Sequence, residues 1–155
     1  MFFSYNLLIP LFIVLPNLLF VVLPPLNMPL LEKEKVIWLI LERIGQAGVF
    51  LVPLFHMVHL DTVTKQAAFA LIIMAVTVYY FCWWRFFRNK RQYIWLFQPL
   101  GIIPIPMAVM PLLYFLASAI IMESLSMFLA AVCLGLGHLP ISYKSYMQMK
   151  HPDNI

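Results

Sequence analysis

A carboxylate and a guanidinium stand side by side in an apolar stretch that is long enough to cross a bilayer. Glu42 and Arg43 interrupt residues 36–60, which otherwise contain no Asp, Glu, Lys or Arg. A charged side chain at the centre of a bilayer costs about 2.5–3.5 kcal/mol on insertion scales unless it finds a partner or water. These two residues are therefore the first candidates for a functional site, suited to carrying a proton or holding the polar end of a ligand.

Helical spacing places Trp38 and Gln46 on the same face as Glu42. At 100° per residue, each lies about 40° from Glu42, whereas Arg43 lies about 100° away. Gln46 can therefore bind the same polar group as Glu42, and Arg43 can hold an anionic or carbonyl group or extend to the headgroups. A structural interpretation competes with this one, because buried polar side chains also pair with one another and hold membrane helices together.

His138 is a further titratable residue within an apolar segment, and it follows Gly135 and Gly137 closely. Glycine lets another helix or a ligand approach the backbone, so tight helix packing alone is one explanation of this pattern. The other explanation is functional. Histidine changes charge near neutral pH, and we expect His138 to lie in the same half of the membrane as Glu42 and to act as its proton partner or assist in ligand binding.

Other residues give weaker signals. His56 and His59 lie one helical turn apart and can share a metal, but no second pair of ligands accompanies them. Cys82 and Cys133 lie in apolar segments and are expected to be free thiols. No phosphate-binding loop or catalytic motif of fixed spacing is present. We therefore expect no metal site and no cofactor, and the sequence assigns no catalytic residue.

The composition places these residues in a membrane protein. Of the 155 residues, 64% are hydrophobic and 10% are charged, and the mean hydropathy is +0.93. Soluble domains are about 45–50% apolar and about 25% charged, so this class is excluded. The net charge of +4 does not indicate nucleic-acid binding, because the basic residues lie between apolar segments.

Five apolar segments are near the ~20 residues that cross a bilayer as a helix. They cover residues 7–26, 36–60, 67–87, 98–122 and 125–142. Their apolar runs are continuous rather than alternating, which favours helices over barrel strands. The predicted fold is all-α: a polytopic membrane protein with a single transmembrane domain over residues 1–155, a bundle of five helices and a short cytoplasmic tail from residue 143.

The basic residues predict the orientation of this bundle. With five crossings, nearly all of them fall on one side, and only Lys65 falls on the other. The positive-inside rule then puts the N-terminus outside and the C-terminus in the cytoplasm. The expected location is a cell membrane, crossed several times, of the bacterial plasma-membrane type. The basic residues on the cytoplasmic side are Lys33, Lys35, Arg85, Arg88, Lys90, Arg91, Lys144 and Lys150.

Prolines disrupt the predicted fourth segment. Pro99, Pro104 and Pro106 each remove a backbone donor, so residues 98–106 are not expected to form a regular helix. One interpretation is a broken segment whose free carbonyls face a ligand. The other is that residues 93–103 lie at the interface and a shorter helix crosses from about residue 106 to 122. Glu123, in the turn that follows, is predicted to be a solvated helix-cap carboxylate.

Three functions fit these features. The leading hypothesis is a protein that binds or carries a small lipophilic molecule, with Glu42, Arg43, Gln46, His138 and Trp38 around its polar end. The second is an intramembrane enzyme that acts on a lipid or isoprenoid. The third is a non-catalytic subunit or assembly factor. The expected partners are the bilayer, a small lipophilic ligand, and a second copy or a membrane partner subunit; nucleic acid is not expected.

Overall fold

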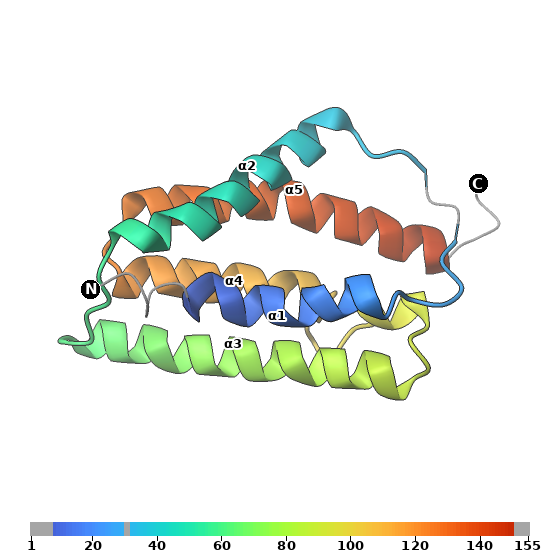
Figure 1. Ribbon diagram of the computed structural model, residues 1–155, viewed down its shortest axis with the longest axis horizontal. Helices are drawn as coiled ribbons and strands as arrows, with labels where there is room; N and C mark the ends of the chain where they lie inside the picture. Colours follow the sequence, from blue (N-terminus) through green and yellow to red (C-terminus); the bar gives the residue numbers. More distant parts are fainter. Residues whose placement is uncertain (1–7, 30–31, 151–155) are drawn as a thin grey trace.

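The computed structural model describes residues 8–29 and 32–150, and this part of the chain is helical, with no β-strand (Figure 1). Its α-helices are α1 (Leu8–Val22), α2 (Val36–Leu51), α3 (Val63–Arg88), α4 (Pro106–Ile121) and α5 (Leu125–Lys150). Two short 3₁₀ helices, η1 (Val52–Phe55) and η2 (Tyr93–Leu96), follow α2 and α3. The all-α prediction is therefore confirmed.

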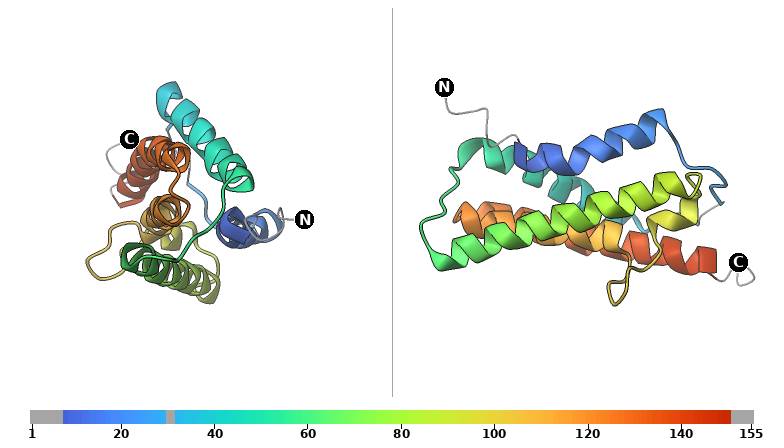
Figure 2. Two further views of the ribbon diagram at one scale, coloured as in Figure 1. Left: turned by 90° about the vertical axis from the view of Figure 1, so that its left-hand side faces the viewer. Right: turned by 90° about the horizontal axis from the view of Figure 1, so that it is seen from below.

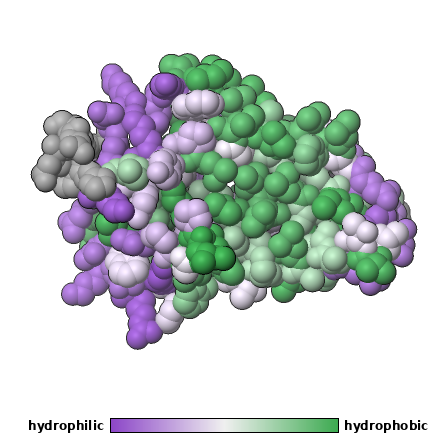
Figure 3. Space-filling view, turned by 180° about the vertical axis from the view of Figure 1, so that it is seen from behind, coloured by the Kyte–Doolittle hydropathy of each residue, from purple (hydrophilic) through white to green (hydrophobic). Residues whose placement is uncertain are grey.

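Within the described residues, three stretches are long and apolar enough to cross a membrane: Val36–Phe55, Val63–Arg88 and Leu125–Lys150. The helices α1 and α4 are also apolar but have only 15 and 16 residues. At 1.5 Å per residue they are about 22–24 Å long, shorter than the ~30 Å hydrocarbon core. Figure 3 shows a broad apolar belt between two polar ends of the molecule, the surface that a membrane protein presents.

Successive helices run in opposite directions. At one end, Lys144 of α5 contacts Glu32 before α2, and the main chain of Leu26 after α1 pairs with that of Arg91 and Tyr93 after α3. At the other end, Lys65 at the start of α3 contacts Glu123 after α4. The helix α4 lies between α3 and α5, α2 crosses α5, and α1 lies to the side against α3 (Figures 1 and 2).

Glycines make the crossing of α2 and α5 a close one. A Cβ added to Gly45 would lie only 2.7 Å from the Cβ of Leu134, and one added to Gly137 would lie 2.5 Å from the carbonyl oxygen of Trp38. Either would also press on backbone atoms of the facing helix. The two helices approach this closely because each has no side chain where the other passes.

Tyrosines attach α1 to the bundle. Pro16 has no N–H, so the carbonyl of Phe12, one turn earlier, loses its helical partner. The Tyr80 hydroxyl of α3 donates to that oxygen at 2.9 Å. The Tyr114 hydroxyl of α4 likewise donates to the Ile9 carbonyl at 2.8 Å. These bonds fix the N-terminal half of α1 against α3 and α4.

The fourth predicted segment is helical only from Pro106 onward. Proline suits the first helical turn, and the residue before it avoids α geometry, so the helix starts at Pro106 rather than at residue 98. Arg85 of α3 donates to the carbonyls of Gln98 (2.6 Å) and Pro99 (3.0 Å), which holds the irregular chain before α4 in place. These bounds agree with the second interpretation of the prolines, which expected a shorter helix from about residue 106 to 122.

Other boundaries also differ from the predicted ones. The helix α5 continues past residue 142 to Lys150, so most of the predicted tail is helical; residues 151–155 lie outside the described residues. Lys144 anchors this extension by donating to the Lys33 carbonyl at 2.9 Å. Glu123 is exposed, as the prediction of a solvated carboxylate requires, and its Oε1 also lies 2.6 Å from Nζ of Lys65, whose side chain is buried. Spacing along the chain could not show that α3 begins beside this turn.

Candidate functional site

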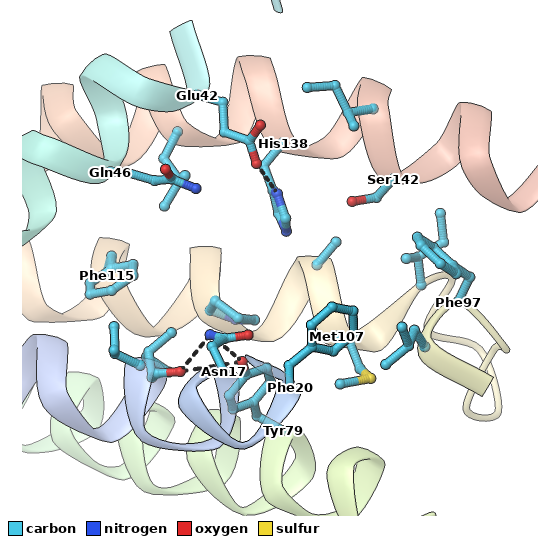
Figure 4. A pocket seen from close by; sticks show the side chains of 18 of the residues that line it. Asn17, Phe20, Glu42, Gln46, Tyr79, Phe97, Met107, Phe115, His138 and Ser142 are labelled. Carbon is cyan, nitrogen blue, oxygen red and sulfur yellow. Dashed lines mark hydrogen bonds and ion pairs between the residues drawn. The ribbon is translucent and has the colours of Figure 1, made fainter. Parts of the chain in front are cut away.

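A cavity of about 520 Å³ lies among the helices, toward the end where α5 finishes (Figure 4). Pockets of about 300–1,000 Å³ with few polar groups are typical of small-molecule sites. Most of the lining is apolar or aromatic. The lining residues are Ile13, Val14, Asn17, Phe20, Glu42, Gln46, Val49, Phe50, Tyr79, Trp83, Tyr93, Leu96, Phe97, Ile105, Met107, Ala108, Pro111, Phe115, Leu134, His138, Ile141, Ser142 and Ser145.

Glu42 and His138 form a pair in the wall of this cavity. Nδ1 of His138 lies 2.6 Å from Oε1 of Glu42, and their side chains are only 34% and 13% exposed. The imidazole ring points from α5 into the cavity (Figure 4). Because the carboxylate holds Nδ1, it fixes the ring orientation and leaves Nε2 to a ligand, as carboxylate–histidine pairs do in other sites.

The glycine crossing brings these two residues together. A Cβ on Gly137 would lie 2.8 Å from the Cα of Glu42, so this part of α2 lies directly on α5. His138 is the next residue of α5, and its side chain reaches the carboxylate at the edge of this contact. The same local pattern therefore provides both the packing and the polar pair, which the sequence presented as alternatives.

Gln46 also lines the cavity, and Arg43 determines which of its amide atoms is engaged. Nη1 of Arg43 donates to Oε1 of Gln46 at 3.1 Å, so the amide nitrogen of Gln46 stays available as a donor. Arg43 itself is exposed and does not line the cavity. Trp38 does not line it either, and its carbonyl oxygen faces Gly137 in the α2–α5 contact.

Asn17 and Tyr79 form a polar group on the opposite wall (Figure 4). Nδ2 of Asn17 donates to the Ile13 carbonyl at 2.8 Å and to the Tyr79 hydroxyl at 3.1 Å, and that hydroxyl donates to the Ile13 carbonyl at 3.3 Å. These bonds engage the amide nitrogen of Asn17 and leave its side-chain oxygen, Oδ1, as an acceptor. Neither residue was predicted from the sequence, although Asn17 is the one polar side chain in residues 7–26.

Ser142 and Ser145 extend the polar lining along α5 toward its C-terminal end, where Tyr93 of η2 also contributes to the wall. Burial raises the pKa of Tyr93, so its hydroxyl remains protonated and neutral at physiological pH. Neither serine was singled out from the sequence. The available signal was their spacing, since residues four and seven positions after His138 fall on the same helix face.

No metal centre forms in the described part of the chain, where no three His, Cys, Asp or Glu side chains gather in an arrangement that would hold an ion. His56 instead places Nδ1 3.0 Å from the carbonyl of Val52, within its own segment. His59 is exposed.

The part of the chain that the structure describes is thus all-helical, with three helices suited to crossing a membrane and a polar pair that faces an internal pocket. No family model, curated protein or solved structure matches the chain.

Proposed function

We propose that the protein is a multi-pass integral membrane protein that binds or carries a small lipophilic molecule with a polar end. The observation that carries this proposal is the cavity of about 520 Å³, which is largely apolar but has the Glu42–His138 pair in its wall. An intramembrane ionisable residue marks a functional site by default. A lipophilic body suits the aromatic walls, and a polar end suits the pair.

Each predicted residue has a role in this proposal that follows from its position. Glu42, His138 and the amide nitrogen of Gln46 contact the polar end of the ligand. Arg43 is a positioning residue, because it holds the Gln46 oxygen. Trp38 contributes through the close contact of α2 with α5 rather than by enclosing the ligand.

In the proposed membrane arrangement all five helices cross, with the N-terminus outside and the C-terminus in the cytoplasm of a bacterial-type plasma membrane. The support is the distribution of charge: Lys33, Arg88, Lys144 and most other basic residues lie at one end of the bundle, and Lys65 lies at the other. The positive-inside rule assigns the basic end to the cytoplasm. The cavity then lies in the cytoplasmic half of the membrane.

Native mass spectrometry of protein extracted gently from its own membranes tests the ligand proposal. We expect the wild type to carry a reproducible added mass and Glu42→Gln to lose it. Glu32→Gln is the matched control, because it makes the same chemical change at an exposed carboxylate outside the cavity. An unchanged added mass in Glu42→Gln, or no added mass in any variant, would contradict the proposal.

The 2.6 Å contact between Glu42 and His138 also favours a second function, an intramembrane enzyme that acts on a lipid or isoprenoid. A histidine oriented by a carboxylate can accept a proton through Nε2 as a general base. Incubating the purified protein with its extracted lipid separates the two functions. An enzyme changes the mass of the lipid or consumes it with a co-substrate, and this change stops in His138→Gln but not in His59→Gln; a carrier returns the lipid unchanged.

The third hypothesis, a subunit bound to a partner through small-residue faces, has less support. Gly45, Gly48, Gly135 and Gly137 all face neighbouring helices within this chain. A partner or a second copy would therefore have to bind another surface. Recovery of a stable complex in mild detergent, with no small molecule attached, would favour this hypothesis over the other two.

A further inference from the structure

A polar row on α5 extends the site beyond the Glu42–His138 pair. His138, Ser142 and Ser145 line the cavity at positions i, i+4 and i+7, so they share one helix face over about 10 Å at 1.5 Å per residue. Ser142 and Ser145 are only 6% and 4% exposed. Figure 4 shows the Ser142 hydroxyl on the cavity side of α5, beyond His138.

No hydrogen bond of the two serine hydroxyls is found among residues 8–29 and 32–150, and neither oxygen is a fully enclosed atom, so both are open to the cavity that they line. A serine in a helix commonly bonds the carbonyl one turn earlier, as Ser118 does to Tyr114 at 2.8 Å. A buried hydroxyl that forgoes this bond loses stability unless another group satisfies it. Two hydroxyls in the wall of one cavity can therefore be satisfied by water or by the polar group of a ligand beside them.

The charges around the cavity restrict the kind of polar group. Among the described residues that line it there is no Lys or Arg, and Glu42 is the one acidic residue. The nearby cations are engaged elsewhere: Lys144 contacts Glu32 and Glu34, and Arg85 donates to two backbone carbonyls. A phosphate or carboxylate would find no Lys or Arg here and would face the Glu42 carboxylate, to which His138 is already bound, and this is unfavourable in a site of low dielectric.

We infer that the ligand is an uncharged lipid whose head carries two or more hydroxyl groups, in the manner of a monoacylglycerol. This inference rests on the proposed function and names the class of ligand for the same cavity. One hydroxyl bonds Nε2 of His138, and another bonds the serine hydroxyls further along α5. A hydroxyl both donates and accepts, so it suits a wall of serines, a histidine and the Gln46 amide.

Three lipids with the same acyl chain test the inference: a monoacylglycerol, its phosphorylated form lysophosphatidic acid, and the fatty acid methyl ester, which has no hydroxyl. Occupancy of the delipidated protein is measured by native mass spectrometry at equal lipid concentrations. We expect the monoacylglycerol to bind about tenfold more tightly than either other lipid, a difference of about 1.4 kcal/mol, because only its hydroxyl groups can bond the row without bringing a charge to Glu42.

Serine variants link this preference to the polar row. The double variant Ser142→Ala/Ser145→Ala should lose most of the preference for the monoacylglycerol while binding the methyl ester as before. Tyr143→Phe is the matched control, because it removes a hydroxyl from an exposed position of the same helix. Thermal unfolding of each variant establishes that it is folded.

The results separate the inference from the proposed function. If lysophosphatidic acid binds as tightly as the monoacylglycerol, or the serine variants keep the full preference, the hydroxyl inference is wrong and the lipid-binding function stands. If none of the three lipids binds, the inference is also overturned. In that case an added mass on the natively extracted protein preserves the proposed function, and its absence removes both.

Discussion

Replacing Gly137 by alanine tests whether the close crossing of α2 and α5 builds the site. The new Cβ would lie 2.5 Å from the carbonyl oxygen of Trp38 and 2.8 Å from the Cα of Glu42, whereas ordinary contacts are 3.4–4 Å. Both are backbone atoms, so no side-chain rotation relieves the clash. The helix α2 must withdraw by about 1 Å, judged from these contact distances.

The expected losses of stability and of ligand occupancy follow from this displacement. Inserting a methyl group into a tightly packed contact typically costs about 1–3 kcal/mol. The Glu42–His138 distance of 2.6 Å lies well within hydrogen-bonding range, but a shift of about 1 Å would take it beyond the ~3.2 Å of a good hydrogen bond. We therefore expect Gly137→Ala to lower the free energy of unfolding by about 1–3 kcal/mol and to lower ligand occupancy as well.

Gly135→Ala is the matched control two residues away. Its Cβ would meet the methyl groups of Leu112 at 2.9 and 3.0 Å, and these lie at the end of a flexible side chain. Thermal unfolding followed by circular dichroism in mild detergent should show a lower melting temperature for Gly137→Ala and little change for Gly135→Ala. Equal effects of the two substitutions, or an unchanged ligand occupancy in Gly137→Ala, would refute the reasoning.

Three further predictions address other parts of the structure. Tyr114→Phe removes the 2.8 Å bond to the Ile9 carbonyl, so amide hydrogen exchange in the first turns of α1 should accelerate. Arg43→Gln frees the Gln46 oxygen and should lower the retained ligand mass, but by less than Glu42→Gln does. Lys65 holds the pKa of Asp61 below its usual 3.8. The pair therefore stabilises the fold above that pH, and its contribution disappears as the pH falls further. Asp61→Asn should remove this part of the acid dependence of the melting temperature.

Each of these predictions has a contradicting result. Unchanged exchange in α1 would show that Tyr114 does not attach it, with Tyr143→Phe as the control for loss of an exposed hydroxyl. An Arg43→Gln variant that loses all bound ligand would make Arg43 a direct contact rather than a positioning residue. If Asp61→Asn and the wild type lose stability identically below pH 3.8, the contact with Lys65 contributes nothing to folding.

The helical character of the chain was predictable because it depends on local composition. Continuous apolar runs predicted all five helices, and α3 begins and ends within a few residues of the predicted 67–87. Ends that depend on distant contacts were harder to predict. The C-terminal extension of α5 is held by Lys144 against the chain before α2, and no pattern within residues 143–150 shows that contact.

In the candidate site, too, residues with a local signal were predictable and residues placed by distant contacts were not. Glu42 and His138 attract attention because a polar residue in an apolar segment is conspicuous, and the structure brings them together. The glycine pattern left packing and function as alternatives, whereas Gly137 makes the close contact of α2 with α5 that also brings Glu42 to His138. Tyr79 is indistinguishable in sequence from the neighbouring aromatic residues of α3, and only the arrangement of α1 and α3 places it beside Asn17.

Photocrosslinking in intact cells tests the central claim, that the cavity holds a specific lipid, most directly. A phenylalanine analogue with a small diazirine is placed at Phe115, which is buried and lines the cavity, or at Phe128, which is exposed on α5. We expect one dominant lipid adduct at Phe115, and a mixture that follows bulk membrane composition at Phe128. The same mixture at both positions, or no lipid adduct at Phe115, would contradict it.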